Sequence, residues 1–478
     1  MPHSRRYTEN LTDPLHDSLR ALLGDDAVLT APADTEPFEI DFRKLFRGRA
    51  LAVVLPREVA QVAAVARWCN EHRIGLVPQG GNTGYCGGAT PDESGRQVVV
   101  SLRRLDRIRA LDAANHSMTV EAGCVLARIQ QAADAADRFF PLSLGSQGSC
   151  QIGGNLSTNA GGLNVVRYGM TRDLVLGIEA VLADGSVLSG LKSLRKDNTG
   201  YDLKSLLIGA EGTLGIITAA TLKLWPKMRA SATALLGLDS PADALALLGA
   251  LRSVAGETLS SFELMPRIGI ELTARYIEGA RDPFAEPHPW YVLCELTASG
   301  TEDLDAPLQQ TLAAAMEHGG VRDATLANNE RVRASFWHLR EHIPEAQRRA
   351  GPSLKHDISV PVASLPDFIA EASAWVRQHV PEGVLVCYGH AGDGNLHFNI
   401  NQIGTASGAR FLARESEIKH AIHDLVARYH GSISAEHGIG RLKREELQRY
   451  ASPVALATMR AIKQALDPNG IMNPGKLL

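Results

Sequence analysis

The chain of 478 residues is too long for one hydrophobic core and should divide into two or three domains. Its net charge of −4 and aromatic content of 5% argue against nucleic acid as a partner, because neither a basic surface nor a stacking platform is expected. The longest apolar stretches, such as residues 244–251, fall short of the roughly 20 residues that a membrane span needs, and the six scattered cysteines form no CxxC pair or disulfide framework.

The N-terminal part of the chain predicts a soluble α/β segment. Residues 1–17 have no apolar core, so we expect no secretory signal and a cytoplasmic location, or solubility in another reducing compartment. Residues 50–56, ALAVVLP, predict a strand, and residues 74–78, IGLVP, predict a second one. Between them a helix starting at residue 57 is predicted from its apolar positions, which are Val62, Val65, Ala66 and Cys69.

Three glycine-rich segments follow these elements. Five glycines lie between residues 80 and 88, seven between 145 and 169, and three more in IGAEGTLGIIT at 208–218. Glycine lets backbone N–H groups turn toward an anion without a Cβ in the way, and the interleaved Ser, Thr and Asn add donors. One such loop is often only a tight turn, but two separated loops suit a dinucleotide pyrophosphate. Neither GxGxxG nor GxxxxGK[ST] occurs, which argues against a nicotinamide dehydrogenase and a Walker P-loop.

Two histidines in the second half lie on a predicted hairpin. In LHFNIN (396–401) apolar and polar residues alternate, which is typical of a strand with one buried face. The preceding VLVCYGH (384–390) predicts its partner strand, and the residues 391–395 between them suit a tight turn. His390 and His397 can then face each other across the hairpin.

The Glu-His pair in SAEHGIG completes a candidate metal site. Two imidazoles and a carboxylate, from His390, His397 and Glu436, suit zinc or a similar divalent ion, and three ligands leave a coordination position open for substrate. Glu436 and His437 are adjacent, so in extended backbone they point opposite ways. We therefore expect Glu436 to hold the metal and His437 to act as the base.

Two polar runs near this site are expected to be surface. Residues 415–429 predict a helix whose apolar positions face inward, so His420 and His423 should face solvent. The inward positions are Ile418, Ile422, Leu425, Val426 and Tyr429. The run RLKREE at 441–446 is interpreted as a solvated helical face.

Four long motifs carry a resemblance to a known family. They are PQGGNTGYCGG (78–88), GSCQIGGNLSTNAGGLNVVRYGMTRDLVLGIEAVLADGSVL (148–188), RKDNTGYDLKSLLIGAEGTLGIIT (195–218) and LDPNGIMNPGK (466–476). They resemble the FAD-binding domain of the vanillyl-alcohol-oxidase/p-cresol-methylhydroxylase superfamily. The second half resembles the branch with a glycolate-oxidase-like C-terminal domain, and the likeness is strongest to the D-2-hydroxyglutarate dehydrogenase family. It runs from about Arg49 to the C-terminus.

The resemblance implies an α+β fold in three parts. A two-subdomain FAD-binding domain is expected at 1–228, with its core at about 46–227. A substrate (cap) domain on an antiparallel sheet, carrying the metal site, is expected at 229–430, and a C-terminal segment at 431–478 should return to the flavin and complete the active site.

The resemblance also implies FAD as the cofactor. Some relatives attach FAD covalently through a His in the first glycine loop. This chain has Asn82 there, so we expect non-covalent FAD. The implied cofactor-binding residues are Pro78, Gly80, Gly81, Asn82, Thr83, Gly84, Gly145, Ser146, Gly148, Ser149, Gly153, Asn155, Thr158, Asn159, Gly161, Gly162, Glu211, Gly212, Gly215, Ile216 and Asn473.

A further motif, FWHLREHIPEAQRRAGPSLKHDISVP (336–361), bears on the substrate. In the family, the Arg of the LRE triplet and the Lys of the K-x-D segment are implied to hold a distal carboxylate, and they fall on Arg340 and Lys355. A guanidinium forks onto a carboxylate, while an ammonium gives a movable point charge. Arg340 could instead be a helix-surface charge. Where the family tends to have Thr, this chain has Pro344, which removes a hydroxyl and an N–H.

The leading hypothesis is an FAD- and metal-dependent dehydrogenase of D-2-hydroxy acids, with D-2-hydroxyglutarate as the first substrate to test. The metal would polarise the 2-hydroxyl, His437 would take its proton, and the C2 hydrogen would leave as hydride to flavin N5. Asn399, on the same strand face as His397, would bind substrate or orient the metal water.

Alternatives of two kinds stay open. Within the same chemistry the substrate could be D-lactate, glycolate or D-malate. From another class, the superfamily includes a flavin-dependent alkyl-glycerone-phosphate synthase, a transferase. We expect an electron acceptor such as electron-transfer flavoprotein or a quinone, and, by resemblance alone, a homodimer.

Overall fold

The computed structural model describes residues 14–404 and 408–478. Most of the N-terminal stretch for which no secretory signal is expected, residues 1–13, lies outside the described residues. No helix within the described ranges is long and apolar enough to cross a membrane. The longest, α8 (Pro241–Ala255) and α13 (Leu365–His379), have 15 residues each.

The first sheet is mostly parallel and is covered on both faces. Its order is β1-β2-β4-β3, and β2 and β3 both run parallel to β4. Runs of valine such as VVV at 98–100 are buried on both sides, as expected for parallel strands between helices. The predicted strands and the helix between them are confirmed. The elements are α1 (Pro14–Leu23), β1 (Val28–Leu29), α2 (Pro32–Glu39), β2 (Ala52–Val54), α3 (Val59–His72), β3 (Gly75–Gln79) and β4 (Gln97–Ser101).

The second sheet is antiparallel and has the order β5-β6-β10-β8-β9. Helices α4 and α5 pack their apolar residues against it in one buried cluster. The elements of this region are β5 (Ile108–Asp112), β6 (Ser117–Glu121), α4 (Leu126–Ala135), β7 (Arg138–Phe139), α5 (Ile152–Thr158), α6 (Val165–Tyr168), β8 (Val175–Val181), β9 (Val187–Ser189), α7 (Leu203–Leu207), β10 (Ile216–Lys223) and β11 (Trp225–Pro226). Strands β7 and β11 pair with each other in a separate two-stranded sheet.

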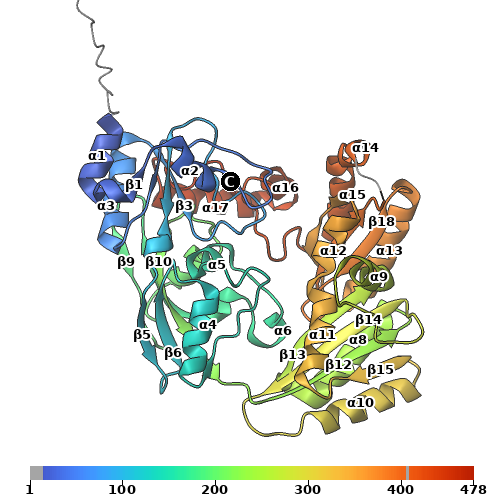
Figure 1. Ribbon diagram of the computed structural model, residues 1–478. Helices are drawn as coiled ribbons and strands as arrows, with labels where there is room; N and C mark the ends of the chain where they lie inside the picture. The colour runs from blue at the N-terminus through green and yellow to red at the C-terminus, as the bar shows by residue number, and fades with distance from the viewer. Residues whose placement is uncertain (1–13, 405–407) are drawn as a thin grey trace, which may run out of the picture.

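The third sheet lies in the second half of the chain and is antiparallel, in the order β13-β14-β12-β15 (Figure 1). Alternate residues of its strands enter two different apolar clusters, so helices cover both faces: α8 and α10 one face, and α9, α11 and α12 the other. The elements are β12 (Ala230–Leu238), β13 (Leu259–Pro266), α9 (Arg267–Tyr276), β14 (Trp290–Ala298), α10 (Asp305–Glu317), β15 (Asp323–Leu326), α11 (Glu330–Glu341) and α12 (Ile343–Ala350).

The fourth sheet contains the predicted hairpin, which is confirmed. Strand β19 is central and pairs with β18 on one side and with β16 and β17 on the other. Leu396, Phe398 and Ile400 are buried against α13 and α15, which leaves the face of His397 to the site. The elements are β16 (Ser353–Leu354), β17 (Asp357–Ser359), β18 (Val384–Tyr388), β19 (Asn395–Asn401), α14 (Ala409–Leu412) and α15 (Glu415–Arg428).

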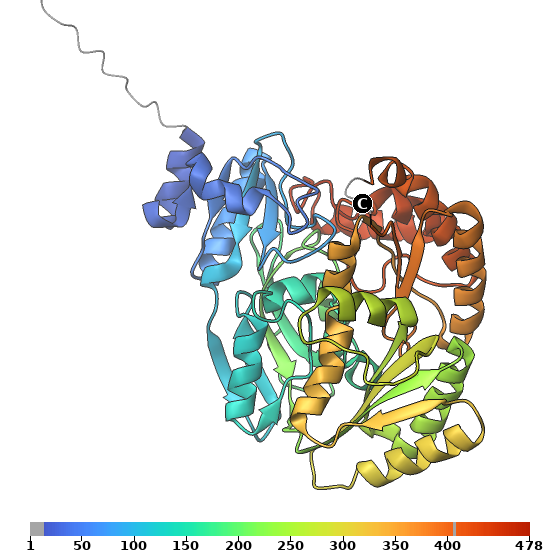
Figure 2. The same cartoon turned by 45° about the vertical axis from the view of Figure 1, so that its right-hand side comes forward.

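The C-terminal segment returns to the first part of the molecule, as the α+β prediction expected (Figures 1 and 2). After α16 (Arg444–Tyr450), helix α17 (Pro453–Leu466) packs Ile462 and Leu466 on the core of the second sheet. The backbone then forms hydrogen bonds with β3, from Leu76 N–H to Ile471 O at 2.7 Å and from Asn473 N–H to Leu76 O at 2.8 Å.

Two surface predictions for this region are wrong in part, because His420 and Glu445 are partly or fully exposed as predicted but His423, Lys443 and Glu446 are buried. His423 of α15 is buried and its Nδ1 lies 2.7 Å from Glu446, and His420 reaches the other oxygen of Glu446 at 2.8 Å. Within 441–446, Lys443 and Glu446 are buried, and the Lys443 ammonium donates to Ile433 O. The polar sequence pattern suggested exposure, but α16 packs against α15, and the buried charged groups form hydrogen bonds and ion pairs in that contact.

Candidate active site

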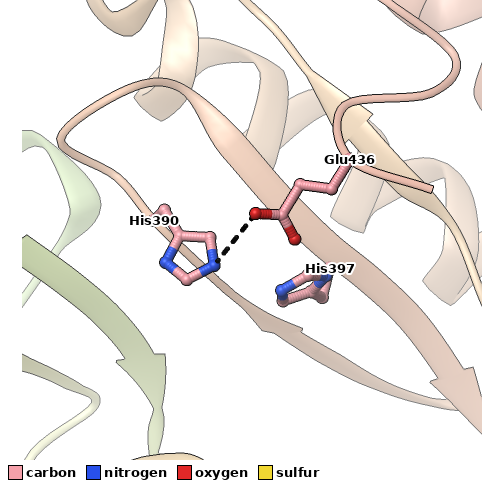
Figure 3. Close-up of side chains that lie close together, drawn as sticks. All are labelled: His390, His397 and Glu436. Atoms are coloured by element: carbon pink, nitrogen blue, oxygen red, sulfur yellow. Dashed lines mark ion pairs between the residues drawn. The ribbon is translucent and has the colours of Figure 1, made fainter. Parts of the chain in front are cut away.

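Two histidines and a glutamate converge beside the β18–β19 hairpin, as predicted (Figure 3). One ligand atom from each of His390, His397 and Glu436 lies within 4.8 Å of the others. His390 Nε2 is 3.7 Å from Glu436 Oε1, and the two imidazole rings have their centroids 5.6 Å apart. His390 follows the end of β18, while His397 projects from β19 opposite Tyr388.

The turn that carries His390 depends on glycine. Gly389 and Gly394 have φ values of 157° and 89°, which residues with a Cβ rarely adopt. A Cβ on Gly389 would lie 2.5 Å from Asn395 O, and one on Gly394 would lie 2.2 Å from Val360 O. The turn therefore holds His390 over the sheet only with glycine at these positions.

A buried carboxylate fixes the orientation of His390. Glu263 of β13 is fully buried, and its Oε1 lies 2.6 Å from His390 Nδ1, which leaves Nε2 directed toward Glu436. Its Oε2 accepts from Arg340 Nε at 2.7 Å. Burial opposes ionisation of Glu263, but His390 and Arg340 outweigh it and lower the pKa of Glu263 to about 2. Glu263 was not predicted from the sequence, although an acid in the apolar strand LSSFELMP was a usable signal.

The charges between His390 and Glu436 favour a bound proton or a cation. Burial alone would lower the pKa of His390, but Glu263 and Glu436 raise it to about 9. Burial raises the pKa of Glu436 to about 7, with Asp357 and Asp393 adding to the effect. A proton or a divalent cation can supply the missing positive charge. The donor set fits a cation, because ligands at about 2.0–2.2 Å from zinc lie roughly 3–4 Å from one another.

His437 lies beside this cluster and is oriented by Asp357. The Asp357 Oδ2 is 3.4 Å from His437 Nδ1 and accepts the backbone N–H groups of Glu436 and His437, both at 2.9 Å. The chain bends here, so the expectation of extended backbone with opposed side chains is wrong. Both side chains instead approach Asp357, and a ligand atom of each lies within 4.8 Å of it.

His437 has the properties of a base. Burial lowers its pKa from the usual value, Asp357 opposes this, and Lys443 and Arg43 lower it further, so the ring is neutral near pH 7. The Tyr85 ring meets its edge with centroids 4.7 Å apart, and the His397 ring lies 6.4 Å away. The sequence analysis missed Asp357, which stands in the quoted K-x-D segment.

The glycine segments line a cleft that opens to solvent and has His437 in its wall. Residues predicted to bind the cofactor that line it are Pro78, Gly80, Gly81, Asn82, Thr83, Gly84, Gly153, Asn155, Thr158, Glu211 and Ile216. Lining residues that were missed are Gln79, Cys86, Gly88, Ala89, Leu102, Cys150, Gln151, Gly154, Ser157 and Ile217. Half of these adjoin a predicted residue in the sequence.

The cleft fits a flavin nucleotide in two respects. Among the residues that the structure describes, the buried side-chain oxygens of Gln79, Gln151 and Asn155 have no hydrogen-bond partner, so they can accept from a ligand rich in N–H and O–H groups. A Cβ on Gly84 or Gly154 would meet nothing within 4 Å, so the backbone there is open to a bound group.

The other predicted cofactor residues do not line the cleft. They are Gly145, Ser146, Gly148, Ser149, Asn159, Gly161, Gly162, Gly212, Gly215 and Asn473. Several of them support residues that do. A Cβ on Gly81 would lie 2.3 Å from Ser149 O, and a Cβ on Gly161 would lie 2.7 Å from Glu436 Oε1. Asn473 Nδ2 donates to Glu211 O at 2.7 Å.

The predicted substrate residues have different surroundings. Arg340 is buried on α11 with its Nη2 2.6 Å from Glu263, so it is not a surface charge. Lys355 is exposed, and desolvation by its neighbours together with the charges of Arg43 and Arg348 lowers its pKa to about 8. Asn399 is buried, and its amide donates to Gln347 and accepts from the His356 N–H.

Comparison with known proteins places these features in a family. Residues 227–477 match the C-terminal domain of FAD linked oxidases, and residues 50–190 match an FAD binding domain. A probable mitochondrial D-2-hydroxyglutarate dehydrogenase of Oryza sativa subsp. japonica is 41% identical over 96% of this chain and 80% of its own. A D-2-hydroxyglutarate dehydrogenase of Xanthomonas citri pv. viticola is 38% identical over 98% of this chain and 97% of its own.

A solved structure supports the fold alone. The p-cresol methylhydroxylase structure with substrate bound has a TM-score of 0.75 and 19% sequence identity, and the match covers 97% of this chain and 96% of that one. The predicted α+β architecture, with an FAD-binding domain and antiparallel sheets in the second half, is thereby confirmed.

Proposed function

Since this chain belongs to the FAD-linked oxidases, among relatives named D-2-hydroxyglutarate dehydrogenase, we propose that it oxidises D-2-hydroxyglutarate to 2-oxoglutarate. As an FAD-dependent oxidoreductase it acts on a CH–OH donor. The observation that carries the proposal is the place of His437, which lies in the wall of the glycine-lined cleft and next to the His390, His397 and Glu436 cluster. A hydroxy acid held at the cluster would therefore lie within reach of the base and beside the flavin.

Each residue has a distinct task in this proposal. When bound, FAD supplies a two-electron acceptor for the C2 hydrogen, and a divalent cation such as Zn²⁺ supplies a Lewis acid. His390, His397 and Glu436 would hold that cation, with Glu263 keeping the His390 ring in one orientation. His437 would take the proton of the 2-hydroxyl, and Asp357 would stabilise the imidazolium that results.

The rest of the substrate would meet cationic and polar groups. Arg340 and Lys355 are proposed to bind the distal carboxylate, with Arg340 using N–H groups that are not directed at Glu263. Asn399 is proposed to orient the substrate from β19. Non-covalent FAD is proposed because Asn82 has no nucleophile, and its amide donates to Ile40 O at 2.8 Å.

Two partners are proposed from the family resemblance. The electrons would pass to an acceptor such as electron-transfer flavoprotein or a quinone, and the chain would form a homodimer. Reduction of the purified acceptors in turn, and the mass in solution by light scattering, test these two statements.

A dye-coupled assay with a panel of acids tests the proposal. Initial rates with D-2-hydroxyglutarate, D-malate, D-lactate and glycolate would give kcat/KM for each. We expect the dicarboxylates to exceed D-lactate by about 10²-fold, from a charge-assisted contact of roughly 3 kcal/mol. Equal efficiency with D-lactate would refute a distal-carboxylate pocket, and Pro344 would be the first residue to examine.

A further inference from the structure

A short turn near the N-terminus, residues 41–46, lies close to the candidate active site. In the segment 41–46, the Asp41 carboxylate accepts the backbone N–H groups of Arg43 at 2.9 Å and Phe46 at 2.5 Å. The backbone N–H of Lys44 donates to Asp41 O, and Lys44 has a positive φ of 58°. These hydrogen bonds hold the turn in one conformation, so the backbone that carries the Arg43 side chain is fixed.

Contacts with aromatic rings connect this turn to the site. The Phe42 ring stacks on Tyr85 with centroids 5.8 Å apart, and the Tyr85 ring in turn meets His437 edge-on. The guanidinium of Arg441, in the segment that follows His437, lies 4.8 Å from the centre of the Phe46 ring. The turn is therefore connected to His437 through the Tyr85 ring.

Two basic side chains near the candidate active site, Arg43 and Lys355, have no acidic partner among the described residues. Across residues 14–404 and 408–478, no carboxylate lies within ion-pair distance of Arg43 or of Lys355. The other neighbouring arginine differs, because Arg348 forms two 2.7 Å bonds with Glu345. Phe42, next to Arg43, reaches His437 through the Tyr85 ring, and Asp357, two residues after Lys355, lies 3.4 Å from the same histidine, so both cations belong to segments that meet at His437. Two close, uncompensated positive charges favour an anion between them.

Arg340 does not offer the same charge. Its guanidinium is buried and pairs with Glu263, and that carboxylate already neutralises it. Arg340 can donate hydrogen bonds from its N–H groups, but the unpaired positive charge that would attract a carboxylate lies on Arg43 and Lys355.

We propose that Arg43 binds the distal carboxylate of the substrate together with Lys355, so that one residue from each half of the molecule contacts the same group. The inference rests on the proposed oxidation of a dicarboxylic hydroxy acid and adds a specificity-determining residue to it. Arg43 selects for a second carboxylate and does not itself accept the proton of the 2-hydroxyl.

The test compares Arg43→Met with Lys44→Met in the FAD-loaded protein. Lys44 is the next residue, is exposed, and carries the same charge, so its variant controls for the change in net charge and for the turn. Calorimetric titration with glutarate, which has both carboxylates but no 2-hydroxyl, measures binding without turnover, and butyrate serves as the monocarboxylate. We expect Arg43→Met to weaken the binding of glutarate by about 10- to 100-fold and the binding of butyrate by less than about twofold. Lys44→Met should leave both unchanged.

Turnover provides a second readout. With D-2-hydroxyglutarate, Arg43→Met should raise KM and leave kcat nearly unchanged, while kcat/KM for D-lactate stays at the wild-type value. Unchanged glutarate affinity in Arg43→Met overturns the inference. An equal loss for glutarate and butyrate also overturns it, because Arg43 would then act on the flavin or on the whole site. If glutarate behaves as expected but wild-type protein does not oxidise D-2-hydroxyglutarate, the proposed function fails and the dicarboxylate subsite stands.

Discussion

Glu263 and His390 are 127 residues apart in the sequence and are joined by a 2.6 Å contact between Oε1 and Nδ1. The contact holds because Gly389, next to His390, forms backbone bridges with Leu264, next to Glu263. The same carboxylate pairs with Arg340. Glu263 therefore connects a candidate metal ligand with a predicted substrate residue, and the orientation of both depends on it.

Glu263→Gln should weaken metal binding. The amide keeps the shape but loses the charge that orients and polarises His390, and loss of such a partner usually costs about 10- to 100-fold in metal affinity. Competition with a coloured chelator measures the affinity for Zn²⁺. Glu341→Gln, an exposed glutamate next to Arg340, is the control. Equal affinity in wild type and Glu263→Gln would show that Glu263 does not support a metal ligand.

His437→Ala and His390→Ala should impair the enzyme in different ways, the first through kcat and the second through metal binding. Loss of a general base lowers kcat by about 10²- to 10⁴-fold, and the metal content should stay intact because His437 is not among the proposed ligands. His390→Ala should lose the metal itself. Elemental analysis after gel filtration, together with kcat, separates the two. Equal metal loss in both variants would make His437 a ligand.

The activity with dicarboxylates should fall above pH 8. The pKa of Lys355 is lowered to about 8 by desolvation and by Arg43 and Arg348, so its ammonium is present below that pH and is lost above it. The kcat/KM for D-2-hydroxyglutarate should therefore decline through pH 8, while that for D-lactate should not.

Lys355→Met provides the control for that pH dependence. The variant should have a lower kcat/KM for the dicarboxylate at pH 7 and should lack the decline near pH 8. A decline of the same size in the variant would assign it to another group.

Gly81→Ala should lose FAD. A Cβ at this position would lie 2.3 Å from Ser149 O, so the two glycine loops could not pack against each other. Gly249→Ala, where a Cβ meets nothing within 4 Å, is the control and should keep its flavin. Absorbance at about 450 nm per mole of protein measures the content. Flavin that stays with acid-precipitated wild-type protein would contradict non-covalent attachment.

Local pattern was sufficient to predict several parts of the structure. The alternation in LHFNIN predicted β19 and its polar face, and the glycine density at 80–88 predicted part of the cleft wall. Both features follow from neighbouring residues, because the period of a strand and the freedom of glycine are local properties. The fold of the whole chain came from resemblance over long motifs.

Long-range packing was not predictable in the same way. Glu263 reaches His390 only because β13 lies beside the hairpin, and nothing within either segment indicates this. His423 and Lys443 were assigned to the surface because their segments are polar, yet the packing of α16 on α15 buries them. The bend at Glu436 is likewise imposed by Asp357, which is distant in the sequence.

The segment 432–442 is attached at both ends to different halves of the protein. Ser432 pairs with Ser359 of the fourth sheet, while the N–H groups of Ile439 and Gly440 donate to Glu211, whose neighbours form the flavin cleft. The proposed base and one proposed metal ligand thus lie on a segment that connects the two halves, and the other proposed ligands belong to one half only. Under the proposed function, neither half alone would activate a hydroxyl group, so alkoxide formation would be confined to the assembled protein, where bound FAD would lie beside the substrate.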